Sequence, residues 1–252
     1  MFVPAKVVTP ENSTDVQSVM IAFKELNLPY LHHASMPGSP ELYEFSPLGK
    51  IPVLVHRPNA IYAVRDRIVL FEPLAIARYI DEVFSSSSDP DGVHLFPVLP
   101  SSQERNYGEV ALRRVEIDQI SSFVAIHVKH AVVDRYVKPY FALRNNGASK
   151  EDIAVALSDA RDAVEQILVL LERIITNTQA QLNLSNSEYM FGSITWADVF
   201  LFPILRDLSA TKSGLLDGNQ KENLPWLAGW LQRFSQRPSA AATLGSSFAG
   251  SV

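Results

Sequence analysis

The imidazole and carboxylate side chains of this sequence offer one arrangement that could bind a metal ion. His127 and His130 lie three residues apart and Asp134 follows four later, so one helix face could present two imidazoles and a carboxylate. A lone His-x-x-His has little specificity and no third strong ligand accompanies it, so we interpret the group as a polar helix face. His32 and His33 end a predicted strand, point to opposite faces and cannot chelate together. We predict no metal site.

The composition excludes several other kinds of chemistry. The 252 residues include no cysteine, which excludes disulfides, thiolate metal sites, iron–sulfur clusters and a cysteine nucleophile. Dinucleotide, P-loop and G-x-S-x-G motifs are missing. The 22 Lys and Arg residues against 27 Asp and Glu give a net charge of −5, which is a poor basis for binding nucleic acid. Without a membrane span or a signal peptide, we expect a cytoplasmic protein.

The first third of the chain alternates strand and helix patterns. Apolar runs predict short strands at 5–8, 30–33, 51–55 and 68–71. Helical spacing of apolar residues predicts helices at 13–26 and 73–83, the first with Ser13 or Asp15 as its N-cap. The last two strands read as a hairpin with a long loop, residues 57–67, whose apolar tip runs from Ile61 to Val64.

The rest of the chain carries helical patterns. A serine-rich segment that begins at Ser85 and reaches Gly92 opens a linker, because it fits neither a helix nor a central strand. Beyond it, apolar periodicity predicts helices at 103–130, 132–143, 150–175, 196–208 and 225–234. We therefore predict an α/β domain at residues 1–85, a linker at 86–102 and an all-α domain at 103–252.

Three motifs in this order resemble the cytosolic glutathione S-transferase family: residues 46–54 (SPLGKIPVL), 70–80 (LFEPLAIARYI) and 189–198 (YMFGSITWAD). The resemblance covers nearly the whole chain. It implies a thioredoxin-like first domain, an all-helical second domain and glutathione as co-substrate. Thr195 and Asp198 in the third motif form a capping-box variant, to which we assign a structural role.

The resemblance also implies binding residues for glutathione. In a thioredoxin-like fold the proline that opens the third strand is cis, which here is Pro52 after Ile51. The backbone of Ile51 would then pair with the cysteinyl backbone of glutathione, and Lys50 would lie near its glycine carboxylate. Family members usually have Glu-Ser where this chain has Glu72 and Pro73. Because proline has neither a hydroxyl nor an N–H, two bonds to the γ-glutamyl carboxylate would be missing.

The catalytic position implied by the resemblance is Ser13, since residues 13–16 (STDV) are similar to the start of the phi-class first helix, whose serine is catalytic. A hydroxyl there would donate to the sulfur and favour the thiolate. Serine is also a common N-cap, so a purely structural role stays open. Thr9, Asn12 and Thr14 are rival donors.

The function implied is transfer of the glutathione thiolate to a small hydrophobic electrophile, as in detoxification, by a homodimer. Acceptor contacts would come from the first helices of the second domain, with these candidates: Tyr107, Arg114, Phe123, His127 and His130. The alternative, favoured by Pro73, is a binding or regulatory module without turnover. A glutathione-dependent reductase is more remote, since disulfide reduction needs a nucleophilic thiol.

Overall fold

A four-stranded mixed sheet forms the centre of the first part of the molecule. The computed structural model describes residues 5–9, 13–58, 66–84, 93–184, 187–216 and 223–251. The strands are β1 (Ala5–Thr9), β2 (Tyr30–Ala34), β3 (Val53–His56) and β4 (Ile68–Phe71), in the order β2-β1-β3-β4. The pairs β1–β2 are parallel, whereas β1–β3 and β3–β4 are antiparallel.

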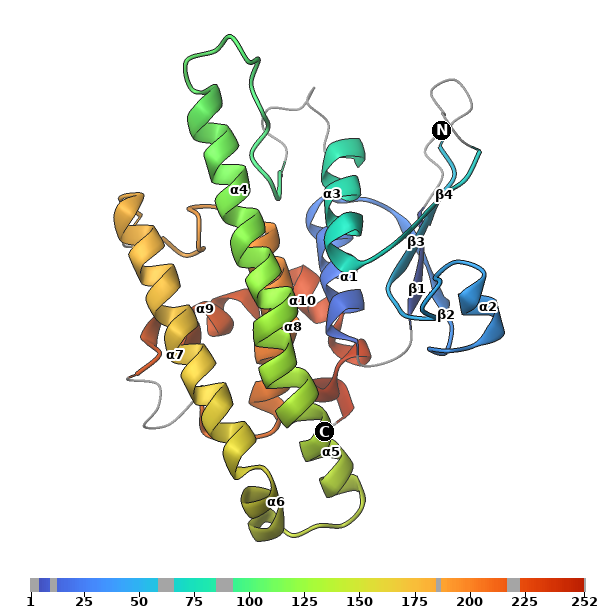
Figure 1. Cartoon of the computed structure of the whole chain (residues 1–252), viewed down its shortest axis with the longest axis vertical. Helices are drawn as coiled ribbons and strands as arrows, with labels where there is room; N and C mark the ends of the chain where they lie inside the picture. Colours follow the sequence, from blue (N-terminus) through green and yellow to red (C-terminus); the bar gives the residue numbers. More distant parts are fainter. Residues whose placement is uncertain are drawn as a thin grey trace. The chain divides into compact units, whose positions relative to one another are not determined.

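Helices cover both faces of this sheet (Figure 1). Helices α1 (Thr14–Glu25) and α3 (Pro73–Phe84) lie on one face, and the short α2 (Pro40–Tyr43) lies on the other. Strand β3 contributes side chains to both faces of the sheet, because successive side chains along a strand alternate between faces. Val53 packs with Leu42 of α2, whereas His56 is buried beside Tyr79 and donates or accepts a 2.7 Å hydrogen bond there. Burial lowers the pKa of His56.

This arrangement confirms the predicted thioredoxin-like fold of the first domain. The helices predicted at 13–26 and 73–83 and the strand at 68–71 are present. The third strand begins two residues later than expected, after Pro52, and α2 was not predicted from its four residues. The tip at 61–64 lies outside the described residues.

The chain forms two compact units that alternate along the sequence. Unit 1 contains residues 1–115 and 238–250, and unit 2 contains most of the remainder, 116–237. The returning segment begins with α10 (Pro238–Ala242), which packs against α1. There the Gln17 Nε2 donates to the Ser246 carbonyl at 2.7 Å, and the Ser239 hydroxyl donates to Glu25. The domain boundaries that the sequence predicts, at residues 85 and 103 on either side of a linker, remain untested.

Unit 2 is helical, and the helix that runs into it from residue 107 of unit 1 differs from the prediction. Residues 107–145 form one continuous helix, shown in green in Figure 1, where a break was predicted near 131. Its segments are α4 (Tyr107–Phe123), π-helix η1 (Val124–Val128), π-helix η2 (His130–Val137) and α5 (Lys138–Asn145). Buried residues from Ile117 to Phe141 recur about every four positions, which suits the wider π turns better than the 3.6-residue α repeat.

The third helix predicted beyond the linker, 150–175, is two helices. They are α6 (Lys150–Ala156) and α7 (Ser158–Gln181), and the chain bends at Leu157, which has a ψ of 14°. Ile153 and Leu157 are both buried, so the apolar pattern continues through the bend and hides it. Helices α8 (Trp196–Ala210) and α9 (Pro225–Phe234) confirm the predictions at 196–208 and 225–234.

The buried carboxylate of Asp198 joins three segments of unit 2. It accepts bonds from the Thr195 N–H at 3.0 Å, the Thr195 hydroxyl at 2.9 Å and the Trp230 indole at 2.9 Å, with the Met190 N–H at 3.4 Å. Burial raises the pKa of Asp198 to about 6, although these donors oppose the rise. The contacts give the third motif a structural role in joining α8 to α9.

A second buried carboxylate caps α9. Leu224 precedes the helix and has no side chain that could accept its free N–H groups. Glu172 of α7 supplies the acceptors instead, at 2.7 Å from the Trp226 nitrogen and 2.9 Å from the Leu227 nitrogen. Burial raises the pKa of Glu172, and the two N–H donors oppose this rise.

We predict that Glu172→Ala lowers the free energy of unfolding by about 2–4 kcal/mol, because two buried N–H groups lose a charged acceptor. Glu172→Gln should fall between the wild type and Glu172→Ala, since it keeps one acceptor oxygen. The control is Asp162→Ala, which removes an exposed carboxylate from the same helix. Urea denaturation measures the three variants, and equal losses for Glu172→Ala and the control would contradict the capping role.

Candidate functional site

Strand register brings two of the predicted site residues to the same end of the sheet. Val53 at the start of β3 pairs with Phe71 at the end of β4. Pro52 and Glu72, the next residues outward, therefore lie opposite one another. Val8 of β1 also pairs with Val53, so β1 ends at this edge as well. The first helix begins from the same edge, since Ser13 follows β1 by only four residues.

The segment before β3 is fixed by its own hydrogen bonds. The Ile51–Pro52 peptide bond is cis, as predicted from the family resemblance. Buried Ser46 accepts the Lys50 N–H through its hydroxyl at 3.2 Å and the Gly49 N–H through its carbonyl at 2.9 Å. Gly49 has a φ of +58°, which glycine adopts without the cost that a side chain would add. The turn thereby holds the backbone of Ile51 in one conformation.

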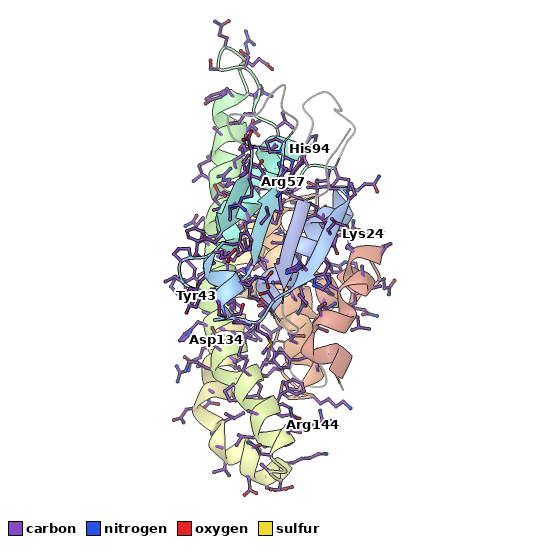
Figure 2. The ribbon with its side chains drawn as sticks, turned by 90° about the vertical axis from the view of Figure 1, so that its right-hand side faces the viewer. Lys24, Tyr43, Arg57, His94, Asp134 and Arg144 are labelled. Atoms are coloured by element: carbon purple, nitrogen blue, oxygen red, sulfur yellow. The ribbon has the colours of Figure 1, made fainter. Side chains whose placement is uncertain are left out.

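Two groups of this segment are without partners in the described part of the chain. The backbone N–H and C=O of Ile51 have no hydrogen-bond partner among the described residues. The side chain of Lys50 is exposed and forms no ion pair within the described part of the chain. Next to it, the ring of Tyr43, which Figure 2 labels on α2, is 55% exposed and lies over Gly49. The edge thus offers backbone hydrogen bonds, a cation and an aromatic surface.

The start of α3 offers further donors. Glu72 precedes the helix with a φ of +71°, and its carbonyl accepts the first intrahelical bond, from the Ile76 N–H at 3.0 Å. Pro73 is the first helical residue, where its missing N–H costs the helix nothing. The N–H groups of Leu74 and Ala75 precede that first bond, so the helix end keeps two backbone donors that favour an anion.

Ser13 caps α1. Its hydroxyl oxygen accepts the Val16 N–H at 3.4 Å, and its φ and ψ of −98° and 115° are those of an N-cap. The hydroxyl donates no hydrogen bond to any described residue, and the side chain is half-buried. The cap and the predicted donation to sulfur use different parts of the hydroxyl, so both roles fit this geometry.

The rival donors have different positions. Thr14 is 4% exposed, which removes its hydroxyl from solvent. Asn12 lies outside the described residues, and only the backbone of Thr9 is described, at the end of β1. Ser13 is therefore the one of these candidates whose described side chain can reach a ligand.

Arg114, a predicted acceptor contact, has another role. It is 7% exposed, donates to the Pro97 carbonyl at 2.7 Å, pairs with Glu82 of α3 and lies over the ring of Phe96. Asp81 completes the group by accepting the Phe96 N–H at 3.1 Å. The guanidinium thus anchors residues 96–97 to α3 and is not available to a substrate.

The other predicted acceptor contacts lie on the long helix of residues 107–145. Tyr107 and Phe123 belong to α4, and His127 belongs to η1. His130 of η2 lies 3.8 Å from Asp134, whose carboxylate also accepts a 2.6 Å bond from Lys138. Within the described residues no group of three acidic or histidine side chains could hold a metal ion, and no helix there could cross a membrane.

Family models match both parts of the chain. The model of the glutathione S-transferase N-terminal domain matches residues 13–83, and that of the C-terminal domain matches residues 150–233. The chain belongs to the glutathione S-transferase family. The two matches together contain the predicted site, from Ser13 to Pro73, and the Thr195 and Asp198 motif. No curated protein matches the sequence.

Several solved structures share the fold over nearly their whole length. A tau-class glutathione S-transferase from mango, Mangifera indica, is 22% identical with a TM-score of 0.63, over 95% of this chain and 91% of that one. Rice GST1 in complex with glutathione is 21% identical, with a TM-score of 0.65 over 96% and 92%. Ure2p in complex with glutathione is 15% identical, with a TM-score of 0.65 over 96% and 98%.

Proposed function

We propose that this protein binds glutathione and transfers its thiolate to small hydrophobic electrophiles. The observation that carries the proposal is the meeting, at one end of the sheet, of the Ile51 backbone, the start of α3 and the end of β1 that leads into α1. These are the groups that a bound tripeptide needs: backbone partners, anion donors and a hydroxyl. Rice GST1 and Ure2p, which share the fold, are solved with glutathione.

The tripeptide fits the donor set of unit 1. The unpartnered N–H and C=O of Ile51 would pair with the cysteinyl backbone, as one added strand pairs with a sheet edge. The exposed ammonium of Lys50 would attract the glycine carboxylate. The γ-glutamyl carboxylate would meet the N–H groups of Leu74 and Ala75 at the positive end of α3. Pro73 removes the two donors that serine would supply there, so we expect weakened binding.

Ser13 would activate the thiol. Its hydroxyl proton, which no described residue accepts, would be donated to the glutathione sulfur while its oxygen continues to cap α1. That bond and the positive end of α1 both favour the thiolate over the thiol, so the thiol pKa falls and its proton passes to water. The thiolate then forms a carbon–sulfur bond with the electrophile, and the displaced group leaves as an anion.

The second candidate function is binding without turnover, which Pro73 favours. In that case the same donors would bind glutathione without catalysing its transfer, in a binding or regulatory role. Two assays separate the candidates: retention on glutathione resin reports binding, and conjugation of 1-chloro-2,4-dinitrobenzene reports turnover. Retention without conjugation supports the binding module.

We predict that Ser13→Ala lowers kcat/KM for conjugation about 10–100-fold, which corresponds to the 1.5–3 kcal/mol of a hydrogen bond to a charged sulfur. The Kd for glutathione should change by less than about threefold, since the hydroxyl is proposed to stabilise the thiolate. The control is Ser149→Ala, which removes an equivalent N-cap from α6. Full activity of Ser13→Ala would reduce Ser13 to a cap and move the search to Asn12 or a backbone N–H.

We predict that Pro73→Ser tightens glutathione binding about 10–100-fold, because it returns one hydroxyl and one N–H to the carboxylate site. Stability should change little, since serine also starts helices well. Pro225→Ser, at the first residue of α9, is the matched control and should leave the Kd unchanged. Calorimetric titration gives both values.

Two other results of the Pro73→Ser titration are informative. A Kd that is tight in the wild type and unchanged in the variant would mean that another group, such as Glu72 through the ammonium, has replaced the missing donors. Binding that is immeasurably weak in both proteins would contradict the glutathione proposal and leave a binding module for another ligand.

We further propose a cytoplasmic homodimer, in which the hairpin and α3 lie near the partner subunit. The apolar tip at 61–64, which motivated this interface, lies outside the described residues. We predict a sedimenting species of about twice the 28.0 kDa chain mass at micromolar concentration. A species of one chain mass under those conditions would contradict the dimer.

A further inference from the structure

Helix α1 is buried on more sides than a helix that only covers a sheet. Such a helix buries one stripe and leaves its opposite face polar and exposed. In α1 every residue from Thr14 to Phe23 is buried, and the polar side chains of Gln17 and Ser18 are as buried as the apolar ones. The returning segment, residues 238–250 of the same unit, covers a second face of α1. The polar face of α1 is therefore used for a contact within unit 1.

The returning segment runs antiparallel to α1. At the last turn of α1 the Ser239 hydroxyl donates to Glu25. About two turns earlier on the helix, the Gln17 Nε2 donates to the Ser246 carbonyl at 2.7 Å. The residues after Ser246 therefore continue toward the first turn of α1, at the end of the unit where Ser13 begins the helix (Figure 1).

Gln17 connects this segment to the turn that carries Ser13. Its backbone N–H donates to the Ser13 carbonyl at 3.0 Å, which is the first intrahelical bond of α1, while its side chain is bound to Ser246. The side-chain cap of the same turn is long, because the Val16 N–H lies 3.4 Å from the Ser13 hydroxyl, beyond the usual range of about 2.7–3.2 Å. The shorter bond from Gln17 thus holds the start of α1 more firmly than the cap bond does.

The acceptor of the Gln17 bond is itself fixed by the fold of the returning segment. The segment folds into two short 3₁₀ turns around buried Ser247. The Ser247 hydroxyl donates to the Leu244 carbonyl at 2.7 Å and accepts the Gly250 N–H at 3.1 Å. A Cβ at Gly250 would overlap with the Leu244 carbonyl oxygen, so only glycine lets the two turns approach this closely. The Ser246 carbonyl between them is therefore held in place.

We propose that Gln17 is a positioning residue for Ser13 and that the returning segment fixes it in that role. The inference rests on the proposed function, because it concerns the hydroxyl assigned to the glutathione sulfur. Such a hydroxyl must be held in place, since a displacement of about 1 Å can cost about 100-fold in rate. The contacts run from Gly250 through the Ser246 carbonyl to the Gln17 amide. Because Gln17 is fully buried, it acts through the start of α1 and not on the ligand.

Two glycines of the returning segment give a matched pair of variants. Gly250→Ala places a methyl group against the Leu244 carbonyl, whereas a Cβ at Gly245 meets no atom within 4 Å, so Gly245→Ala is the control. Conjugation of 1-chloro-2,4-dinitrobenzene is measured over a range of pH. We expect Gly250→Ala to lower kcat about 5–30-fold and to raise the apparent thiol pKa in the kcat profile. The KM for glutathione should change by less than about threefold, because Lys50, Ile51 and the start of α3 are untouched.

A second variant breaks the same link from the side of α1. Gln17→Met removes the amide but fills about the same space, and it should change kcat and the pH profile as Gly250→Ala does. In a Ser13→Ala background neither variant should have a further effect, since both act through the Ser13 hydroxyl. A general loss of stability would lower activity equally in both backgrounds, and urea denaturation measures that stability. Losses that multiply with Ser13→Ala would overturn the positioning role.

Hydrogen exchange tests the link without the transferase reaction. In the ligand-free chain the amides of residues 16–18 should exchange about 5-fold faster or more in Gly250→Ala and Gln17→Met than in the wild type and Gly245→Ala. Equal rates in all four proteins would overturn the proposal, whatever the activity. Faster exchange in the two variants of a chain that conjugates no electrophile would support the link to Ser13 and contradict the proposed function, so the two failures are distinct.

Discussion

The pairing of Val53 with Phe71 is the constraint on which the proposed site depends. Side chains alternate along a strand, so a shift of one residue would exchange the two faces of β3. Val53 would leave the α2 side, and His56 would lose its place beside Tyr79. The same shift would separate Pro52 from Glu72. One strand register therefore determines both the core packing and the geometry of the proposed site. The register is fixed because a shift would move buried side chains out of the cores on both faces of the sheet.

The start of α3 combines two demands that conflict. A proline in the first turn fixes the backbone and stabilises the helix, whereas an anion there requires N–H groups. Glu72 makes the junction possible by adopting a left-handed conformation, with a φ of +71°, which non-glycine residues rarely take. Glu72 and Pro73 thus affect both helix stability and ligand affinity. In this chain Pro73 favours the stability of the helix over the number of N–H groups for an anion.

Much of this fold follows from local patterns. A β-branched apolar run predicts the strand at 68–71, and apolar periodicity with a first-turn proline predicts the helix at 225–234. The structure has both elements where they were predicted. The π-helical turns from Val124 to Val137 could not be predicted in this way, because a four-residue repeat reads as two α-helices in different phase. The bend at Leu157 is hidden for the opposite reason, since its buried residues keep the helical repeat.

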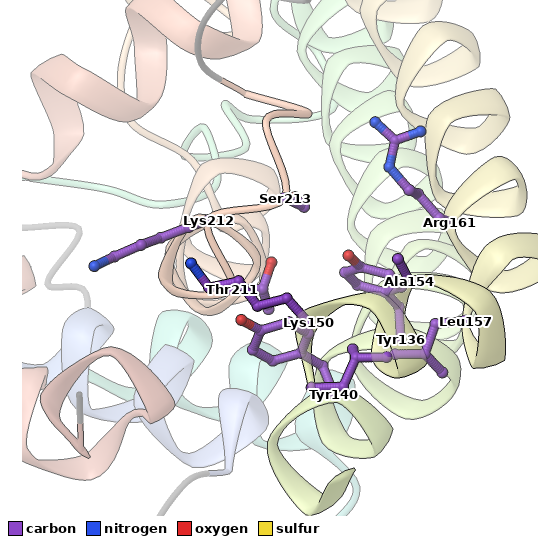
Figure 3. A pocket seen from close by; sticks show the side chains of 10 residues that line it. Tyr136, Tyr140, Lys150, Ala154, Leu157, Arg161, Thr211, Lys212 and Ser213 are labelled. Atoms are coloured by element: carbon purple, nitrogen blue, oxygen red, sulfur yellow. The ribbon is translucent and has the colours of Figure 1, made fainter. Parts of the chain in front are cut away.

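The candidate site was predictable where backbone chemistry is distinctive and less so elsewhere. Pro52 was predicted through the resemblance of residues 46–54 to the family, in which the proline that opens the third strand is cis, and the structure has this cis bond. The structural role of Arg114 had no local signal, since its partners, Glu82 and Pro97, are 17 or more residues away in sequence. A pocket in unit 2 is lined by residues of η2, α5, α6, the start of α7 and the turn after α8 (Figure 3), so no single stretch of sequence carries its pattern.

The return of residues 238–250 to unit 1 has a consequence for how the protein is made. A ribosome would release the whole sheet and α1 long before the segment that packs on α1. At about 5–20 residues per second, the roughly 170 residues from α3 to Gly250 take about 8–30 s to synthesise. Gln17 and Ser18 of α1 are fully buried in the finished protein. During that interval the face of α1 that residues 238–250 later cover is exposed to solvent. Unit 1 thus completes its fold only after unit 2 has been translated, and a nascent chain that stalls between the two exposes a surface that chaperones would have to shield.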